Sequence, residues 1–122
     1  HIDLMPTILD LARVTVPRGV QGLSYRAVLE GTEKVGRISA YLEDDSEDAK
    51  DYMRTLWTPR YRLTYELPSV DGELYDLEAD PNEFHNRWND PDYRSARHDM
   101  IEQLLQASIE ASDPKPQRLT SA

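Results

Sequence analysis

The expected fold follows from one stretch of the sequence, Tyr61-Arg62-Leu63-Thr64-Tyr65, with Asp71-Gly72 and Glu73-Leu74-Tyr75-Asp76-Leu77 after it. Apolar and polar residues alternate in the first segment, as they do in a half-buried strand. The Asp-Gly pair is typical of a tight hairpin between two strands. The sequence therefore predicts two antiparallel strands, at 61–65 and 73–77.

Two further strands are predicted upstream of this pair, at 37–43 and 52–57. The acidic residues between them, which include Asp44 and Asp45, are predicted to form a charged loop. The turn at 58–60 leads from the second strand to the third. Short connections of this kind favour antiparallel neighbours, so the four strands should form a meander.

A helix over 91–112 is predicted after the strands, with Asp90 as its N-cap and Pro91 at its first position. Asp113-Pro114 should end it, because the residue before a proline disfavours helix. Arg97 belongs to the polar side that is predicted to face away from the sheet. The apolar side consists of Tyr93, Ala96, Met100, Ile101, Leu104, Leu105 and Ile109. A helix covering one face of a four-stranded antiparallel sheet is an α+β architecture.

The N-terminal part of the chain reads differently from the strand region. Residues 1–12 predict a short helix, with Pro6 in its first turn and Asp3 as a capping residue or a favourable charge at its N-terminal end. A second short apolar piece covers 23–29. We therefore predict a terminal helical segment at 1–35 and a small domain at 36–122.

Composition excludes several classes of function. The chain has 122 residues, enough for one modest core, and a net charge of -9. An acidic protein is a poor partner for nucleic acid or for an anionic membrane surface, so neither is expected. The absence of cysteine excludes disulfides and thiolate metal sites. No apolar run reaches the roughly 18 residues of a membrane span.

Three stretches resemble the C-terminal end of the sulfatase family. The first is Asp3-Leu4-Met5-Pro6-Thr7-Ile8-Leu9-Asp10-Leu11-Ala12, which continues to Gly22-Leu23-Ser24, although Arg13 stands where the family usually has glycine. The second is Arg54-Thr55 with Arg60-Tyr61-Arg62. The third and most specific is the motif from Glu73 to Asn86, which is similar to the family pattern E-L-Y-D-L-x-x-D-P-x-E-x-x-N.

The resemblance implies that the chain is the end of a larger hydrolase. Family members have a large N-terminal α/β domain with the active site and a small C-terminal domain packed against it. The parent would hydrolyse sulfate esters with a formylglycine residue and Ca²⁺ or Mg²⁺. The missing catalytic domain would be the main partner of this chain. A periplasmic or extracellular parent is also implied.

The chain itself contains no recognisable catalytic motif, and no catalytic, cofactor-binding or metal-binding residue is assigned. Formylglycine arises from Cys or Ser in C/S-x-P-x-R, and the only Ser-x-Pro, at Ser112-Asp113-Pro114, lacks the arginine. Asp44-Asp45 is expected to be a solvated loop, with an adventitious hard-cation site as the alternative. The chain alone is therefore expected to be inactive, and its substrate contacts are unknown.

The remaining candidates have structural explanations that we prefer. His1, His85 and His98 are predicted to be surface or turn residues, since no two have the spacing of metal ligands. His85 has the best functional alternative, because it lies in the loop after the fourth strand. Turn-forming roles are expected for Asp76, Asp80 and Asn86. Core or interface roles are expected for Trp57 and Trp88.

Two alternatives to a sulfatase domain stay open at this point. One is a free-standing protein-interaction module, and the other is the C-terminal domain of a phosphonate or phosphate ester hydrolase of the same superfamily. Residues 1–16 are also rich in exposed-looking apolar side chains, which favours packing on the small domain or self-association.

Overall fold

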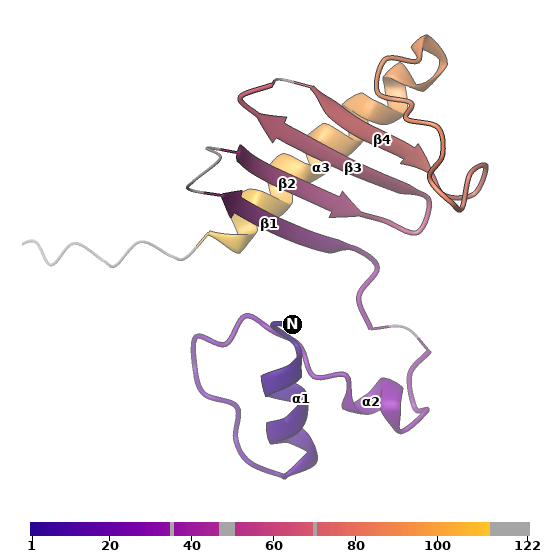
Figure 1. The fold of residues 1–122 in the computed structure, drawn as a ribbon. Helices are drawn as coiled ribbons and strands as arrows, with labels where there is room; N and C mark the ends of the chain where they lie inside the picture. Colours follow the sequence, from indigo (N-terminus) through magenta and orange to yellow (C-terminus); the bar gives the residue numbers. More distant parts are fainter. Residues whose placement is uncertain (35, 47–50, 70, 113–122) are drawn as a thin grey trace, which may run out of the picture. The chain divides into compact units, whose positions relative to one another are not determined.

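A computed structural model describes residues 1–34, 36–46, 51–69 and 71–112. The chain divides into two compact units, His1–Ile38 and Ser39–Ala122. We call them the N-terminal unit and the sheet unit, and Figure 1 shows the elements of both. No helix in the described ranges is long and apolar enough to cross a membrane.

The N-terminal unit contains two helices, α1 (Leu4–Leu11) and α2 (Arg26–Leu29). Pro6 lies in the first turn of α1 as expected and is buried. Asp3 occupies the N-cap position, but its side chain makes no capping hydrogen bond. The capping role predicted for Asp3 is therefore wrong, because its carboxylate is bound elsewhere, as described below.

Four strands form the sheet of the second unit. They are β1 (Ala40–Ser46), β2 (Asp51–Trp57), β3 (Tyr61–Leu67) and β4 (Gly72–Asp76). Each pairs antiparallel with the next in chain order, so the sheet is the predicted meander. The register aligns Leu56 with Leu63 and Leu63 with Leu74, which places three leucines side by side on one face.

A long helix covers that face. A short 3-10 turn, η1 (Pro91–Tyr93), leads into α3 (Arg94–Ala111), and the Asp90 side chain caps it by accepting the Asp92 N–H. Leu63 and Leu74 are fully buried, and Met100 and Leu104 of α3 pack in the same cluster with Leu56 and Trp88. The structure confirms the α+β fold, with α3 behind the sheet in Figure 1.

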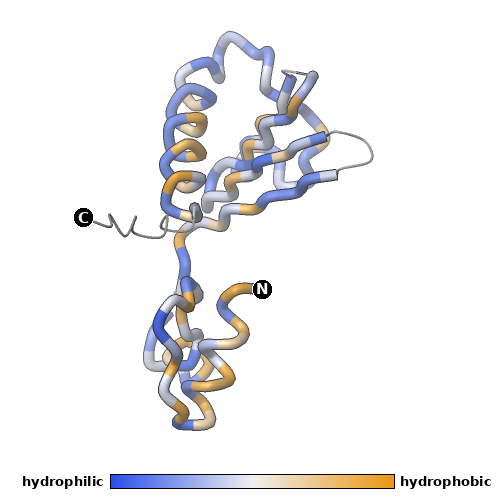
Figure 2. The backbone as a smooth tube through the Cα atoms, turned by 90° about the vertical axis from the view of Figure 1, so that its left-hand side faces the viewer, coloured by the Kyte–Doolittle hydropathy of each residue, from blue (hydrophilic) through white to orange (hydrophobic). Residues whose placement is uncertain are grey.

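The predicted inner side of α3 is partly wrong. Leu105 and Ile109 are 62% and 65% exposed, whereas Ala107 packs against the core. Arg97, predicted to face away, lies 5.2 Å from the centre of the Trp88 ring and donates to the Trp88 carbonyl. The residues that contact the core therefore include 93, 97, 100, 104 and 107, which recur every three or four positions as one side of a helix does. In Figure 2 the hydrophobic colour recurs along the side of α3 that faces the sheet.

The first strand begins later than the sequence predicts. The expected strand at 37–43 is observed at Ala40–Ser46, so Asp44 and Asp45, which were expected in a loop, are in β1 together with Glu43. An edge strand with exposed side chains tolerates these acids, and Arg54 on β2 pairs with Glu43 and Asp45. The predicted loop residues 47–50 lie outside the described ranges.

The two edges of the sheet are closed in different ways. At the β4 edge, the Asn86 side chain accepts from the Leu74 N–H and donates to the Gly72 carbonyl, and the Arg87 N–H donates to the Leu74 carbonyl. The segment at 86–87 thus takes the place of a fifth strand. The β1 edge carries instead the acidic run Glu43-Asp44-Asp45.

Candidate functional site

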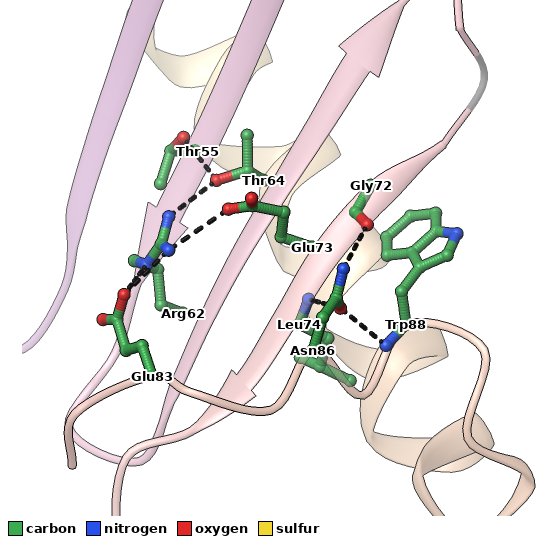
Figure 3. A network of polar contacts seen from close by, with 9 residues as sticks. All are labelled: Thr55, Arg62, Thr64, Gly72, Glu73, Leu74, Glu83, Asn86 and Trp88. Atoms are coloured by element: carbon green, nitrogen blue, oxygen red, sulfur yellow. Dashed lines mark hydrogen bonds and ion pairs between the residues drawn. The ribbon is translucent and has the colours of Figure 1, made fainter. Parts of the chain in front are cut away.

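The face of the sheet opposite α3 presents polar side chains around one arginine. Successive residues of a strand point to opposite faces, so Thr55, Arg62, Thr64 and Glu73 lie on the side away from the buried leucines. Figure 3 shows these four side chains together on one side of the sheet. We call this surface the open face.

The guanidinium of Arg62 contacts two carboxylates, a hydroxyl and an aromatic ring. It bonds Glu83 at 2.8 Å and Glu73 at 3.2 Å, and donates to the Thr64 hydroxyl at 3.1 Å. Its guanidinium carbon lies 4.7 Å from the centre of the Tyr75 ring, a cation–π distance. The side chain is only 19% exposed. Burial lowers the pKa of Arg62, but Glu83 and Glu73 outweigh it and hold the pKa above its ordinary value.

A shallow depression of about 360 Å³ lies beside Arg62 on the open face. Apolar residues Leu42 and Met53 line it together with the acidic residues Asp44 and Glu66. Arg62 is already neutralised by two carboxylates, so the acidic side chains dominate the field of this surface. A negatively charged ligand is therefore not favoured here.

The loop after β4 is fixed by three side chains that the sequence predicted as turn formers. Asp76 accepts from the N–H groups of residues 78 and 79, and burial, which raises its pKa, is outweighed by Arg60 and these N–H groups, which lower it. Asp80 accepts the His85 N–H at 2.8 Å. Asn86 accepts from the Leu74 and Trp88 N–H groups. These turn-forming roles are confirmed.

Glycine at position 72 has a role beyond the predicted hairpin. A Cβ atom on Gly72 would lie 2.6 Å from the Trp88 ring and 2.6 Å from the Thr64 carbonyl oxygen. Trp88 is buried and meets Tyr65 edge to face at 5.7 Å. The predicted core position of Trp88 is thus correct, and it depends on glycine at 72. Trp57, by contrast, is half exposed, and Arg62 lies 5.9 Å from its ring.

The histidines do not come together. His85 and His98 are both largely exposed; His85 lies 3.3 Å from Asp80 and His98 lies 3.5 Å from Glu102. His1 is exposed in the other unit. In the described part of the chain, no three His, Asp or Glu side chains are grouped so that they could hold a metal ion.

Asp44 and Asp45 do not form a paired-carboxylate site in a loop. Neighbours in a strand point to opposite faces, so the two side chains diverge. Asp45 binds Arg54, whereas Asp44 lines the depression. The alternative of a cation site made by both carboxylates is therefore not supported by their geometry.

A polar network that the sequence did not predict organises the N-terminal unit. Arg37 binds both oxygens of Asp3 at 2.7 Å, and the Leu23 N–H donates to Asp3 at 2.6 Å. Thr7 donates to the Asp3 carbonyl and accepts the Tyr25 N–H. The Arg37 hydrogen bond is the main reason why the pKa of Asp3 lies far below its ordinary value, against the opposing effect of burial.

Arg13 keeps the end of helix α1 in the form that glycine normally provides. Its φ is 60°, in the left-handed region. The Val14 N–H donates to the Leu9 carbonyl and the Arg13 N–H to the Asp10 carbonyl, which is the Schellman pattern. The helix end therefore has the usual hydrogen bonds although the position is not a glycine, with an arginine in a strained backbone conformation.

Similar proteins identify the origin of this arrangement. The family model described as N-sulphoglucosamine sulphohydrolase, C-terminal, matches residues 1–110. A Δ4,5-hexuronate-2-O-sulfatase of Bacteroides thetaiotaomicron is 35% identical over 96 residues, 75% of this chain and 20% of that protein. A structure in complex with its substrate D-glucosamine-2-N,6-O-disulfate has a TM-score of 0.79 at 27% identity, over 96% of this chain and 25% of that one.

A third similar structure belongs to a different kind of hydrolase. The phosphonate monoester hydrolase of Silicibacter pomeroyi has a TM-score of 0.77 at 25% identity, with 91% of this chain and 25% of that one covered. The chain thus spans about a fifth to a quarter of the length of these proteins. With the family model matched over residues 1–110, the chain belongs to the N-sulphoglucosamine sulphohydrolase C-terminal family, the C-terminal portion of sulfatases.

Proposed function

We propose that this chain completes a larger sulfatase that hydrolyses sulfuric esters of sugars. The observation that carries the proposal is the family match over residues 1–110 combined with coverage of only 20–25% of the relatives. The sheet unit would have a structural role and would supply loops to the rim of the active site. The named relatives act on sulfated hexuronate or glucosamine, so a sulfated sugar is the proposed substrate class.

The N-terminal unit is proposed to pack on the catalytic domain. Among the described residues of this unit, no large apolar side chain is buried apart from Pro6, and the other buried residues are Asp3 and Thr7. The exposed ones are Ile2, Leu4, Met5, Ile8, Leu11, Val14, Leu23, Leu29 and Ile38. A surface of this kind favours a partner. We propose the domain boundary at 35/36, with 1–35 belonging to the large domain.

Self-association through residues 1–16 is the competing explanation for these apolar side chains. Light scattering of the 122-residue chain and of a version without residues 1–16 separates the two ideas. We expect the intact chain to associate and the shortened one to be monomeric when no catalytic domain is present. A full-length protein that stays monomeric would assign the surface to the intramolecular contact. Equal monomers of equal thermal stability would show that the segment has no packing role.

The chemistry is proposed to come from outside this chain. By family resemblance, the parent would use a formylglycine residue and Ca²⁺ or Mg²⁺, and it would be periplasmic or extracellular. Asp44, Asp45 and the histidines do not converge on a common point, so no catalytic step is assigned to them. We expect the 122-residue chain alone to give no turnover of 4-nitrophenyl sulfate.

Assays of the full-length protein test the proposal directly. Turnover of sulfated glucosamine or hexuronate, measured by sulfate release, is the expected result. The structural similarity to a phosphonate monoester hydrolase favours one second candidate, phosphonate ester hydrolysis. If a phenyl phosphonate ester is cleaved with the higher kcat/KM, the second candidate replaces the first. Turnover by the purified short chain that survives repurification would contradict its assignment as a non-catalytic domain.

A further inference from the structure

We propose that Phe84 and His85 form a contact for the sugar ring of the substrate. The proposal rests on the proposed function and names residues of the sheet unit that would form part of the rim. Both residues belong to the loop after β4, between Glu83 and Asn86, which Figure 3 labels. They are adjacent in sequence and are 78% and 68% exposed.

Three polar side chains of the loop are bound within the sheet unit. Glu83 binds Arg62, Asp80 accepts the His85 N–H, and Asn86 holds the β4 edge. Glu83 has a φ of 56°, a conformation that costs energy for a residue other than glycine. Backbone strain held by surrounding hydrogen bonds is often found where a protein contacts its ligand. The loop thus has a fixed shape from which two side chains are left free to project.

The imidazole of His85 is oriented as a ligand-binding group would be. Asp80 Oδ2 lies 2.8 Å from the His85 backbone nitrogen and 3.3 Å from Nδ1, so one carboxylate oxygen fixes both the main chain and the ring. With the Nδ1 proton directed to Asp80, Nε2 remains available to a hydroxyl or to a sulfate oxygen. Asp80 is largely buried, whereas the ring is exposed to solvent.

An aromatic ring beside an oriented hydrogen-bonding group matches the chemistry of a sugar. The C–H face of a pyranose packs on an aromatic ring, and its hydroxyl groups bond polar atoms at the edge. In the sequence, Phe84 lies between the polar residues Glu83 and His85. A protein-docking surface would instead be a contiguous apolar patch.

The test compares His85→Ala and Phe84→Ala in the full-length protein with two matched controls. His98→Ala removes an equally exposed histidine on α3, and Ile109→Ala removes an equally exposed apolar side chain. With glucosamine-2-N,6-O-disulfate, we expect KM to rise about tenfold for each loop variant, the loss of roughly one ligand contact. The rise in KM should leave kcat within about twofold, and the controls should match the wild type.

Three outcomes would overturn the proposal. One is an unchanged KM in both loop variants. A second is a fall in kcat on both this sugar and 4-nitrophenyl sulfate together with a lower melting temperature, which would make Phe84 a docking residue for the catalytic domain. The third is an NMR spectrum in which the His85 ring signals, assigned from His85→Ala, do not move when the sugar is added. If those signals move although no sulfate is released, the contact stands and the proposed catalytic function fails.

Discussion

Replacing Asn86 with alanine tests whether one side chain closes the β4 edge. Its Oδ1 accepts the Trp88 N–H at 2.9 Å and the Leu74 N–H at 3.0 Å, and its Nδ2 donates to the Gly72 carbonyl at 3.1 Å. Each such hydrogen bond contributes about 1 kcal/mol net. Water can reach part of this edge and will replace some of the lost partners. We therefore expect Asn86→Ala to lower the free energy of unfolding by about 2–3 kcal/mol.

Urea unfolding followed by tryptophan fluorescence measures this change, because the fluorescence reports on the sheet unit. The two tryptophans of the chain, Trp57 and Trp88, both belong to the sheet unit. With a urea m-value of about 1–1.5 kcal/mol/M for a unit of this size, the midpoint should fall by roughly 2 M. Asn82→Ala, at an exposed turn position, is the control and should change stability by less than about 0.5 kcal/mol.

Asn86→Asp separates the accepting role of the side chain from its donating role. The aspartate retains the oxygen that receives two N–H groups, but it places a second oxygen against the Gly72 carbonyl. We expect a loss of about 1–2 kcal/mol at neutral pH, smaller than that of the alanine variant. If Asn86→Ala unfolds at the same urea concentration as the wild type, the edge is closed by other groups and the reasoning is wrong.

Three other predictions concern the core and the N-terminal unit. Leu74→Ala should cost about 2–5 kcal/mol in urea unfolding, whereas Leu105→Ala on the exposed side of α3 should cost less than about 0.5 kcal/mol; equal effects would refute the core assignment. Arg13→Gly should remove the strain of a left-handed arginine and slow amide exchange in α1 by a few-fold, a gain of up to about 1 kcal/mol, and faster exchange would contradict this. Because the folded pKa of Asp3 is depressed, its contribution is present above the unfolded value of about 4 and is lost as pH falls below it. NMR signals of α1 followed from pH 7 to pH 2 should show this loss in the wild type and not in Asp3→Asn.

Local patterns predicted the strands and their order because their causes are local. The alternation at 61–65 and the cap at Asp90 each need only a few neighbouring residues. The Asp71-Gly72 pair indicated a hairpin correctly, but Gly72 is the first residue of β4, so the connection precedes it. The turn roles of Asp76, Asp80 and Asn86 follow from the short polar side chains that bond nearby backbone groups. The structure confirms these predictions.

The errors arise where distant residues decide the outcome. Arg37 looked like the start of a strand, but its guanidinium binds Asp3, which is 34 positions earlier. The packing side of α3 depends on where the sheet lies, so Leu105 remained exposed although it is apolar. The Arg62 cluster joins β3, β4 and the loop after β4, and the sequence gives no sign that Glu73 and Glu83 would meet at one guanidinium.

The loop proposed to contact the sugar also combines local and distant effects. The Asp80–His85 contact spans five residues and could have been anticipated from turn chemistry. The exposure of Phe84 could not, because the only phenylalanine in a chain is ordinarily expected in the core. Its neighbour Glu83 binds Arg62, which lies on β3 and is distant in the sequence.

The different closure of the two sheet edges has a consequence for aggregation. Unprotected edges allow sheets of separate molecules to join strand to strand. Growth from the β4 side is blocked because Asn86 already occupies the Leu74 N–H and the Gly72 carbonyl. On the other side, a second β1 strand would bring three carboxylates towards Glu43, Asp44 and Asp45, and like charges would repel it. Edge-to-edge joining of these sheets is therefore hindered on both sides, by an occupied edge at β4 and by a charged edge at β1.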